Sequence, residues 1–219
     1  MTYSEAIQNS AEIRAYLDGA DRNFAAMGYT EQGVRHGGYT ATVAGDLLSA
    51  LGYPPADVER VRAAGLLHDI GCVVSYRDHA RTGAALAHML CGSLITDRRD
   101  LLAVVEMIGS HEDTTYGAYN PTASALIIAD KTDVHRGRVL KTDMQTFDKY
   151  DRVHYAVTTS KLHTDAQTRT LHLDLAIDTD VCSVLEYFEL FLSRVAFCQK
   201  AASVLGGRFT MTINGVRYL

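Results

Sequence analysis

The stretch Leu66-Leu67-His68-Asp69-Ile70-Gly71 sets an imidazole and a carboxylate directly after an apolar run that begins at Ala63. Such a run predicts a segment that is buried in the fold. A buried carboxylate without a partner costs several kcal/mol or loses its charge. A cation held beside His68 and Asp69 would remove that cost, so this stretch predicts a charged site inside an apolar core.

The residues on both sides of this stretch show a helical pattern that extends to about residue 148. Apolar residues recur at steps of three and four, and Gly or Pro residues separate the repeats. The helices expected from this period are Thr40–Leu51, Asp57–Leu67, Ala80–Leu90, Asp100–Ile108 and Thr122–Val134.

The pattern changes in the last third of the chain. Val153–Leu162 and Thr168–Asp178 alternate around a polar turn, which predicts a β-hairpin. A long amphipathic helix is expected at Cys182–Leu205, and Asn214-Gly215 between two short apolar runs predicts a terminal hairpin. We therefore expect a mainly α fold, with a helical domain over 1–148 and an α+β extension over 149–219.

The composition excludes several classes of protein. The chain has 219 residues, a formal net charge of −5 and 47% hydrophobic residues, which is ordinary for a globular protein. The acidic balance argues against a general nucleic-acid binder. The four cysteines form no CxxC pair, and neither a secretory signal nor an apolar run long enough to span a bilayer is visible. These features predict a cytoplasmic protein with free thiols and no membrane partner.

Further His and Asp residues fall in register with the apolar stripes of the expected helices. Steps of three and four residues separate each of them from apolar positions, which puts them on interior faces. With the central pair they form a set of six: His36, His68, Asp69, His79, His111 and Asp130. By the same period, His88 falls on the outer face of its helix.

This set of six predicts a metal site. Any single interior His is more often a hydrogen-bonded core residue, but six converging ligands favour metal. Neutral imidazole and carboxylate suit divalent Fe, Mn, Mg, Ni, Co or Zn, and six ligands with a bridging carboxylate can hold two ions. Two such ions can activate a water molecule and hold the attacking and leaving oxygens of a phosphoryl transfer.

Basic side chains near these positions are candidates for binding phosphate. Lys131 directly follows Asp130, and Arg81 and Arg136 lie close in sequence to other members of the set. An Arg binds phosphate through two parallel hydrogen bonds, and Lys acts as a point charge. The alternative is that these side chains lie on a solvated face or pair with nearby carboxylates.

Three further segments flank the expected ligands. Glu31 precedes His36 and serves either as an outer carboxylate or as a helix cap. Glu112 follows His111 and is placed to orient a ligand or to transfer a proton through water. The loop after it contains Tyr116 and Tyr119, which are available to stack on a base.

The order of the six residues resembles that of the HD-domain metal-dependent phosphohydrolases. Three segments carry the resemblance: LLHDIG (Leu66–Gly71), HARTGAALAHML (His79–Leu90) and IIADKTD (Ile127–Asp133). Segments over nearly the whole chain, among them ADKTDVHRGRV and INGVRYL, are similar to a bacterial and archaeal group of predicted HD-superfamily hydrolases.

The resemblance implies an all-helical HD core and a role for each ligand. His36, His68, Asp69 and Asp130 match the ligand set found across the superfamily, with Asp69 bridging the ions. His79 and His111 match the extra histidines of its dinuclear members. Those members include phosphohydrolases and mixed-valence di-iron oxygenases, so the ligands do not separate these two activities.

The sequence therefore predicts a dinuclear phosphohydrolase with a small phosphorylated substrate. Metal-activated water would cleave a phosphoester or phosphoanhydride of a nucleotide or another small metabolite, with Asp69 and Lys131 as catalytic residues. The alternatives are a di-iron oxygenase and a non-catalytic sensor that keeps the metals as structural elements.

Two other features bear on the partners. The superfamily's cyclic-dinucleotide phosphodiesterases carry a GYP-containing loop, whereas Gly52-Tyr53-Pro54 lies between His36 and His68, where it joins two helices. The resemblance thus argues against cyclic dinucleotides as substrates. The apolar faces of Cys182–Leu205 exceed what a two-stranded hairpin could cover, which predicts a homodimer, or else an intramolecular core.

Overall fold

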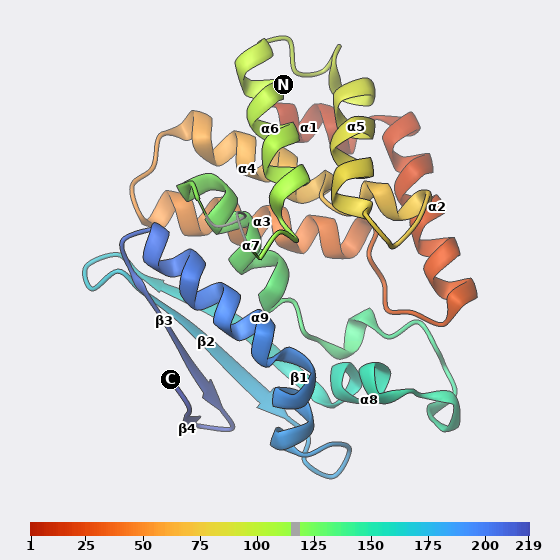
Figure 1. Ribbon diagram of the computed structural model, residues 1–219, viewed down its shortest axis with the longest axis vertical. Coiled ribbons are helices and arrows are strands. Elements are labelled where there is room, and N and C mark those ends of the chain that lie inside the picture. Colours follow the sequence, from red (N-terminus) through yellow and green to blue (C-terminus); the bar gives the residue numbers. More distant parts are fainter. Residues whose placement is uncertain (115–118) are drawn as a thin grey trace.

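The computed structural model describes residues 1–114 and 119–219. A bundle of helices forms one part of the molecule, and a four-stranded sheet covered by one long helix lies beside it (Figure 1). The helices in the described ranges are α1 (Tyr3–Gln8), α2 (Ala11–Met27), α3 (Val34–Ala50), α4 (Pro55–Leu67), α5 (His79–Cys91), α6 (Arg98–Ser110), α7 (Pro121–Thr132), α8 (Lys149–Ala156) and α9 (Val184–Val204). The 3₁₀ turns are η1 (Ile70–Val73), η2 (Arg136–Arg138) and η3 (Met144–Thr146), and the strands are β1 (Val157–Asp165), β2 (Thr170–Ile177), β3 (Arg208–Ile213) and β4 (Val216–Arg217).

The mainly α fold with a small α+β part is confirmed, and each of the five expected helices is present. Local capping explains several of their ends. Asn120 caps α7 by accepting a hydrogen bond from the Ala123 amide at 2.7 Å, and Pro121 occupies the first turn. Helix α3 begins six residues before its predicted start, where the Glu31 carboxylate accepts a hydrogen bond from the His36 amide at 3.0 Å. Glu31 therefore has the capping role.

Two glycines allow a close approach of the elements that carry the central histidines. A Cβ on Gly65 of α4 would lie 2.6 Å from the Ala41 backbone of α3. A Cβ on Gly71 of η1 would lie 2.1 Å from the carbonyl oxygen of His79. Neither distance is possible for a real side chain, so glycine sets the spacing between α3, α4, η1 and α5.

The C-terminal strands form a single sheet. β1 pairs with β2 antiparallel, with Leu162 opposite Leu173, and β3 pairs with β4 antiparallel, so both predicted hairpins are confirmed. β2 and β3 pair in parallel, with Leu171 opposite Phe209, which joins the hairpins in the order β1-β2-β3-β4. Helix α9 provides the crossover between these parallel strands and lies across the sheet (Figure 1).

The predicted start of the first hairpin, at Val153, was wrong, because β1 begins at Val157. Residues 153–156 belong to α8, so His154 lies in a helix and not in a strand. The reason is a capping box, in which Asp148 accepts a hydrogen bond from the Asp151 amide and Asp151 accepts one from the Asp148 amide. This box starts a helix whose inner face buries Val153 and His154.

The apolar core continues from the bundle into the C-terminal part. One cluster of buried side chains includes Leu47 and Leu67 of the bundle, Leu173 of the sheet and Phe191 of α9. Helix α7 and the sheet cover the apolar face of α9. This packing corresponds to the intramolecular core that was the alternative to a homodimer. The division of the chain at residue 148 stays a prediction.

Two expectations concern the chain as a whole. The four cysteines are buried free thiols. Over the ranges 1–114 and 119–219, the helices are all too short or too polar to cross a membrane.

Candidate metal centre

The structure brings the six expected ligands together where the ends of five helices meet. His36 lies in the first turn of α3, and Asp130 lies in the last turn of α7. The others lie at or just beyond helix ends: His68 and Asp69 after α4, His79 at the start of α5 and His111 after α6. All six are at least 93% buried. This clustering is the arrangement that the periodicity predicted.

The first group of ligand atoms surrounds one point between α3, α4 and α7. His36 Nε2 lies 3.1 Å from His68 Nε2 and 3.2 Å from Asp130 Oδ1. Asp69 Oδ2 lies 3.6 Å from His36 Nε2 and 3.3 Å from His68 Nε2. The ligand atoms of His36, His68 and Asp130 therefore lie close enough to share one ion, and Asp69 adds a carboxylate beside the two imidazoles.

The second group lies on the other side of the Asp69 carboxylate. Asp69 Oδ1 lies 3.1 Å from His79 Nε2 and 3.6 Å from His111 Nε2, and these two nitrogens are 3.2 Å apart. Glu112 Oε1 lies 3.9 Å from His111 Nε2. The two oxygens of Asp69 thus face two different pairs of histidines.

The outer ring nitrogens of the four histidines identify the atom that would bind a metal. The Nδ1–H groups of His68, His79 and His111 donate to backbone carbonyl oxygens at 2.9, 2.9 and 2.7 Å. His36 Nδ1 lies 2.7 Å from Asp133 Oδ2, which also accepts. Because each Nδ1 donates a hydrogen to an outer acceptor, Nε2 is the ring atom that faces the centre and would bind a metal.

This donor set fits a divalent metal. Ligand atoms about 2.1 Å from a tetrahedral or octahedral ion lie about 3.0–3.4 Å from one another. Most of the distances within each group are close to that range. Nitrogen lone pairs that face each other at 3.1 Å repel unless a proton or a metal ion lies between them.

The electrostatics of the centre favour ionised carboxylates. Burial alone would raise the pKa of Asp69, but the His68, His111 and His79 side chains hold it well below its usual range. Burial would lower the pKa of His68, but Asp69 and Asp130 raise it to about 10. Asp130 likewise has a lowered pKa, because Lys131 and the histidines outweigh its burial. The carboxylates are therefore in the form that binds metal.

Asp133 supports the centre from outside. Besides its contact with His36 Nδ1, its carboxylate accepts a hydrogen bond from Arg35 at 2.7 Å. Arg138 donates to the Asp133 carbonyl oxygen at 3.0 Å. The pKa of Asp133 is strongly lowered, since these neighbours outweigh its burial. Asp133 therefore fixes the orientation and tautomer of His36.

Lys131 lies at the edge of the centre, as the sequence predicted. Its ammonium donates to Asp130 Oδ2 at 2.7 Å and to the Glu112 carboxylate. Burial would lower the pKa of Lys131, but these two carboxylates raise it, so the side chain stays charged. The Glu112 pKa is lowered, because Lys131 outweighs the loss of hydration.

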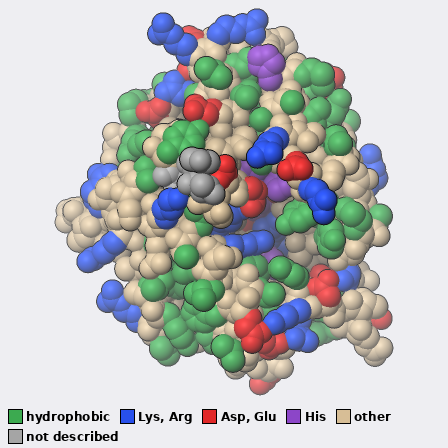
Figure 2. Space-filling model, viewed as in Figure 1, with side chains coloured by type: hydrophobic (Ala, Val, Ile, Leu, Met, Phe, Trp, Pro, Cys, Tyr) green, Lys and Arg blue, Asp and Glu red, His purple; other side chains and the backbone are tan. Residues whose placement is uncertain are grey.

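A small cavity opens onto the ligands. Its volume is about 20 Å³, and Asp69, His79 and Asp130 line it together with Lys131. The space-filling view shows a hollow on this face with His, acidic and basic side chains in it (Figure 2). The combination of anionic ligands and a charged lysine is suited to a metal ion beside an anionic substrate.

The two arginines predicted to bind phosphate lie elsewhere. Arg81 is exposed and lies 4.0 Å from Asp78, away from the cavity lining. Arg136 stacks on the Tyr155 ring with its guanidinium carbon 4.9 Å from the ring centre. Arg138, two residues later, does line the cavity. The side chains of Arg136 and Arg138 leave the 3₁₀ turn η2 in different directions, and phosphate binding by either stays a prediction.

Two peripheral expectations have simple outcomes. His88 is exposed on the outer face of α5, as predicted. Tyr119 donates a hydrogen bond to Glu106 at 2.9 Å and lines no cavity near the ligands. Tyr116 lies outside the described residues.

Sequence reasoning missed Arg194 and Tyr76, which also line the cavity. Arg194 comes from α9, about sixty residues beyond the last ligand, and only the tertiary packing of α9 brings it there. The Tyr76 ring stacks on His79, with 5.6 Å between ring centres and 9° between planes. Its position three residues before His79 was the available signal, because a turn there holds the Tyr76 carbonyl against His79 Nδ1.

Comparisons with known proteins agree with this geometry. A family model described as HD domain matches residues 34–155, which is more than half of the chain and includes all six candidate ligands. A search of curated proteins found no match.

Proposed function

Because this chain belongs to the HD-domain family, whose members are typically metal-dependent phosphohydrolases, we propose that it hydrolyses a small phosphorylated molecule. The scissile bond would be a phosphoester or a phosphoanhydride. The centre would use two divalent ions, with Asp69 as the ligand common to both.

The observation that carries the proposal is the position of the Asp69 carboxylate. One oxygen lies within 3.6 Å of His36 and His68, and the other lies within 3.6 Å of His79 and His111. A carboxylate between two imidazole pairs is the arrangement that holds two ions a few Å apart. A centre for one ion would leave one of the pairs without a function.

The chain's own residues would position and stabilise the substrate. Divalent ions at this centre supply Lewis-acid activation of a water molecule. Lys131 keeps its charge and lies at the cavity wall, where it would stabilise negative charge on the transferred phosphoryl group. Its bonds to Asp130 and Glu112 fix the ammonium in place, so that little reorganisation is needed.

The first experiment is a mass-spectrometric substrate screen on metal-loaded protein, run with and without O₂. The panel contains nucleotides, dinucleoside polyphosphates, sugar phosphates and phosphonates. We expect turnover without O₂ and products that have gained the atoms of water. Turnover only with O₂ would exclude hydrolysis and support the di-iron oxygenase. No turnover in either arm would favour a sensor that uses the metals as structural elements.

Metal content tests the ligand assignment separately. In Asp69→Asn, loss of the charge and of one ligand oxygen is expected to remove at least one metal ion per chain, measured by inductively coupled plasma mass spectrometry. His88→Ala, on the exposed face of α5, is the matched control and should keep the wild-type content. Full stoichiometry in Asp69→Asn, or loss in His88→Ala, would show that the assignment is wrong.

A further inference from the structure

A second, larger cavity adjoins the one at the ligands. Its volume is about 220 Å³, and the residues before α3, the turn before α5 and helices α8 and α9 line it. It shares Gln32, Tyr76, Arg138 and Arg194 with the small cavity, so these four side chains border both cavities. We refer to this larger cavity as the side chamber.

Aromatic rings form one wall of the side chamber. Phe24 lies 5.6 Å from Tyr29 and 5.8 Å from Tyr76, measured between ring centres, and both pairs meet edge to face. Tyr29 and Tyr76 are 46% and 53% exposed, although they pack on a buried phenylalanine. The Tyr76 ring also stacks on His79 and lies 6.1 Å from the Tyr29 ring, and the exposed remainder of both rings lines the cavity. Such surface is typical of sites that bind a ring.

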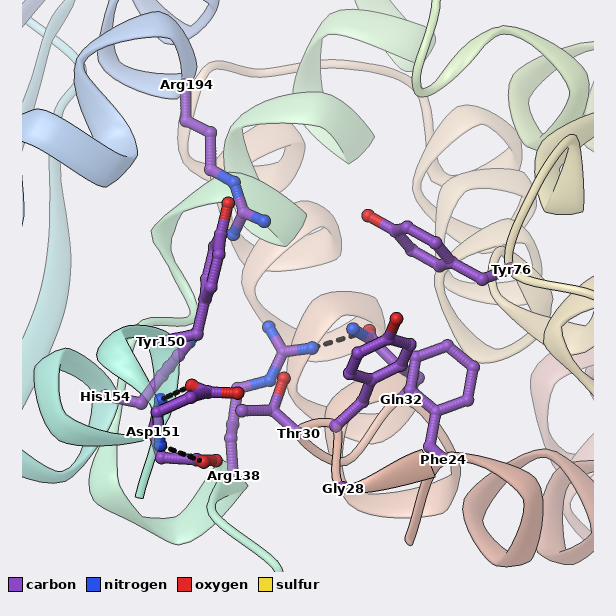
Figure 3. Close-up of a pocket in the computed structure, with 12 residues that line it drawn as sticks. Phe24, Gly28, Thr30, Gln32, Tyr76, Arg138, Tyr150, Asp151, His154 and Arg194 are labelled. Atoms are coloured by element: carbon purple, nitrogen blue, oxygen red, sulfur yellow. Dashed lines mark hydrogen bonds between the residues drawn. The ribbon is translucent and has the colours of Figure 1, made fainter. Parts of the chain in front are cut away.

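Helix α8 forms the opposite wall with two residues four positions apart. Tyr150 is 51% exposed, and His154 is 2% exposed. Figure 3 shows Tyr150 across the cavity from Tyr76 and Phe24, with Arg138 and Gln32 at the base between them. A planar ring placed here would lie between aromatic side chains on two sides.

His154 is a polar group without a partner in this wall. Its Nδ1 is buried and makes no hydrogen bond to any described residue. A buried polar atom of this kind costs about 1–3 kcal/mol unless something satisfies it. Gln32 also lines the cavity, on the side of Phe24 and Tyr76 (Figure 3), and its amide oxygen accepts a hydrogen bond from Arg138.

One of the four side chains that border both cavities has a free positive charge. Arg138 is occupied, because it donates to the carbonyl oxygens of Glu31 and Asp133 and to Gln32. Arg194 packs on Phe191, 4.7 Å from its ring centre, and pairs with no described carboxylate. Its guanidinium is thus available to an anion that lies between the side chamber and the metal centre.

We propose that the side chamber binds a single planar heterocycle, and that this ring belongs to the phosphate ester whose phosphate lies at Arg194 and the metal centre. The inference rests on the proposed function for the fate of that phosphate. The volume of about 220 Å³ is sufficient for one ring system. The specificity of the centre therefore comes from α8 and α9, in the C-terminal part of the chain.

Equilibrium binding tests this proposal without requiring turnover. The full chain, dialysed against a chelator, is titrated by calorimetry with adenosine and uridine 5′-monophosphates, pyridoxal 5′-phosphate and phenyl phosphate. Ribose 5-phosphate is the matched ligand that has the phosphate but no aromatic ring. We expect at least one ring-bearing phosphate to bind about tenfold or more tightly than ribose 5-phosphate, which is the usual size of a stacking contribution.

Variants locate the ring. Tyr150 is half exposed, so its replacement leaves the core intact. Tyr150→Ala is expected to abolish most of the preference for the ring-bearing ligand, and Tyr150→Phe to retain it. Arg194→Gln is expected to lower the affinity for ring-bearing phosphates and for ribose 5-phosphate by a similar factor. Arg99→Gln, an exposed arginine on α6, should change neither affinity.

The outcomes separate this inference from the proposed function. Equal affinity for ribose 5-phosphate and every ring-bearing phosphate would overturn the inference, as would a preference that Tyr150→Ala leaves unchanged. Hydrolysis of ribose 5-phosphate by the metal-loaded chain would still support a phosphohydrolase in either case. Conversely, a ring preference that depends on Tyr150, without hydrolysis of any ester, would support the side chamber and contradict the proposed function.

Discussion

The bond between His36 and Asp133 shows how single residues outside the centre control it. His36 is fully buried, and its Nδ1 lies 2.7 Å from a carboxylate, whereas the other three histidines donate to backbone carbonyls. A carboxylate makes the ring a stronger ligand than a carbonyl does. His36 is therefore the ligand most sensitive to a substitution that leaves all six coordinating residues in place.

Asp133→Asn tests this sensitivity. The amide keeps the shape of the side chain but loses the charge that faces His36 and Arg35, so metal affinity is expected to fall about 10- to 100-fold. Competition with a chromogenic chelator measures the affinity. Asp180→Asn, at an exposed position before α9, is the control. Unchanged affinity in Asp133→Asn would contradict a supporting role.

At the scale of the element, the centre depends on where helices stop. His68 and His111 follow the last turns of α4 and α6, and His79 opens α5. Their Nδ1 groups bond to carbonyls three residues earlier, so each local turn holds its own imidazole. The glycine contact between η1 and the start of α5 then fixes the distance between neighbouring ligands.

Substitutions of two glycines test that contact. Gly71→Ala would place a Cβ 2.1 Å from the His79 carbonyl, so α5 must move, and the unfolding free energy is expected to fall by about 1–3 kcal/mol or more. Gly38→Ala, in open space on α3, is expected to raise it by about 0.5–1 kcal/mol. Thermal unfolding followed by circular dichroism measures both. A stable Gly71→Ala with normal metal content would show that the close approach is not required.

At the scale of the whole molecule, one apolar core joins the bundle, the sheet and α9. Helix α9 packs on α7, which carries Asp130 and Lys131, and it also supplies Arg194 to the cavity wall. The C-terminal part is therefore a component of the candidate site. The homodimer stays a prediction for sedimentation analysis, since the described chain already covers the buried face of α9.

Removal of metal tests whether the ions are structural. Metal binds the folded state, so at a concentration about 100 times Kd it adds about 2.7 kcal/mol of stability. We expect chelation to lower Tm while the far-ultraviolet circular dichroism at 25 °C is retained, because the apolar core is independent of the ligands. Loss of the helical signal would instead favour the sensor with structural metals.

The acid sensitivity of folding reports on His154. Burial first, and then the charges of Arg138 and Arg194, lower the pKa of His154 well below 6.5. The unfolded chain therefore binds more protons than the folded one below about pH 6.5, and this contribution to stability is complete above that pH and is lost as the pH falls. His154→Gln is expected to show a shallower loss of stability than wild type between pH 6.5 and 5, measured by urea unfolding. If the stability of His154→Gln and of wild type fell equally between pH 6.5 and 5, His154 would not be a neutral buried residue.

The local patterns of the sequence were sufficient for the helices and for the burial of the six residues that cluster at the candidate centre. An amphipathic period states which face of a helix is buried, and a His or Asp on that face must meet the interior wherever the helix packs. That is why His36, His111 and Asp130 could be assigned before the packing was known. The turn signals around Asn214-Gly215 were equally local, and that hairpin is present.

Contacts between distant segments needed the folded chain. The parallel pairing of β2 with β3, the arrival of Arg194 beside Asp130 and the choice of Arg138 over Arg136 all depend on how separate elements pack. Periodicity describes one element at a time and contains no information about which element will face it. The ligands of the centre are therefore a property of the local sequence, whereas the side chamber that would select the substrate arises from the packing of α8 and α9 against the bundle.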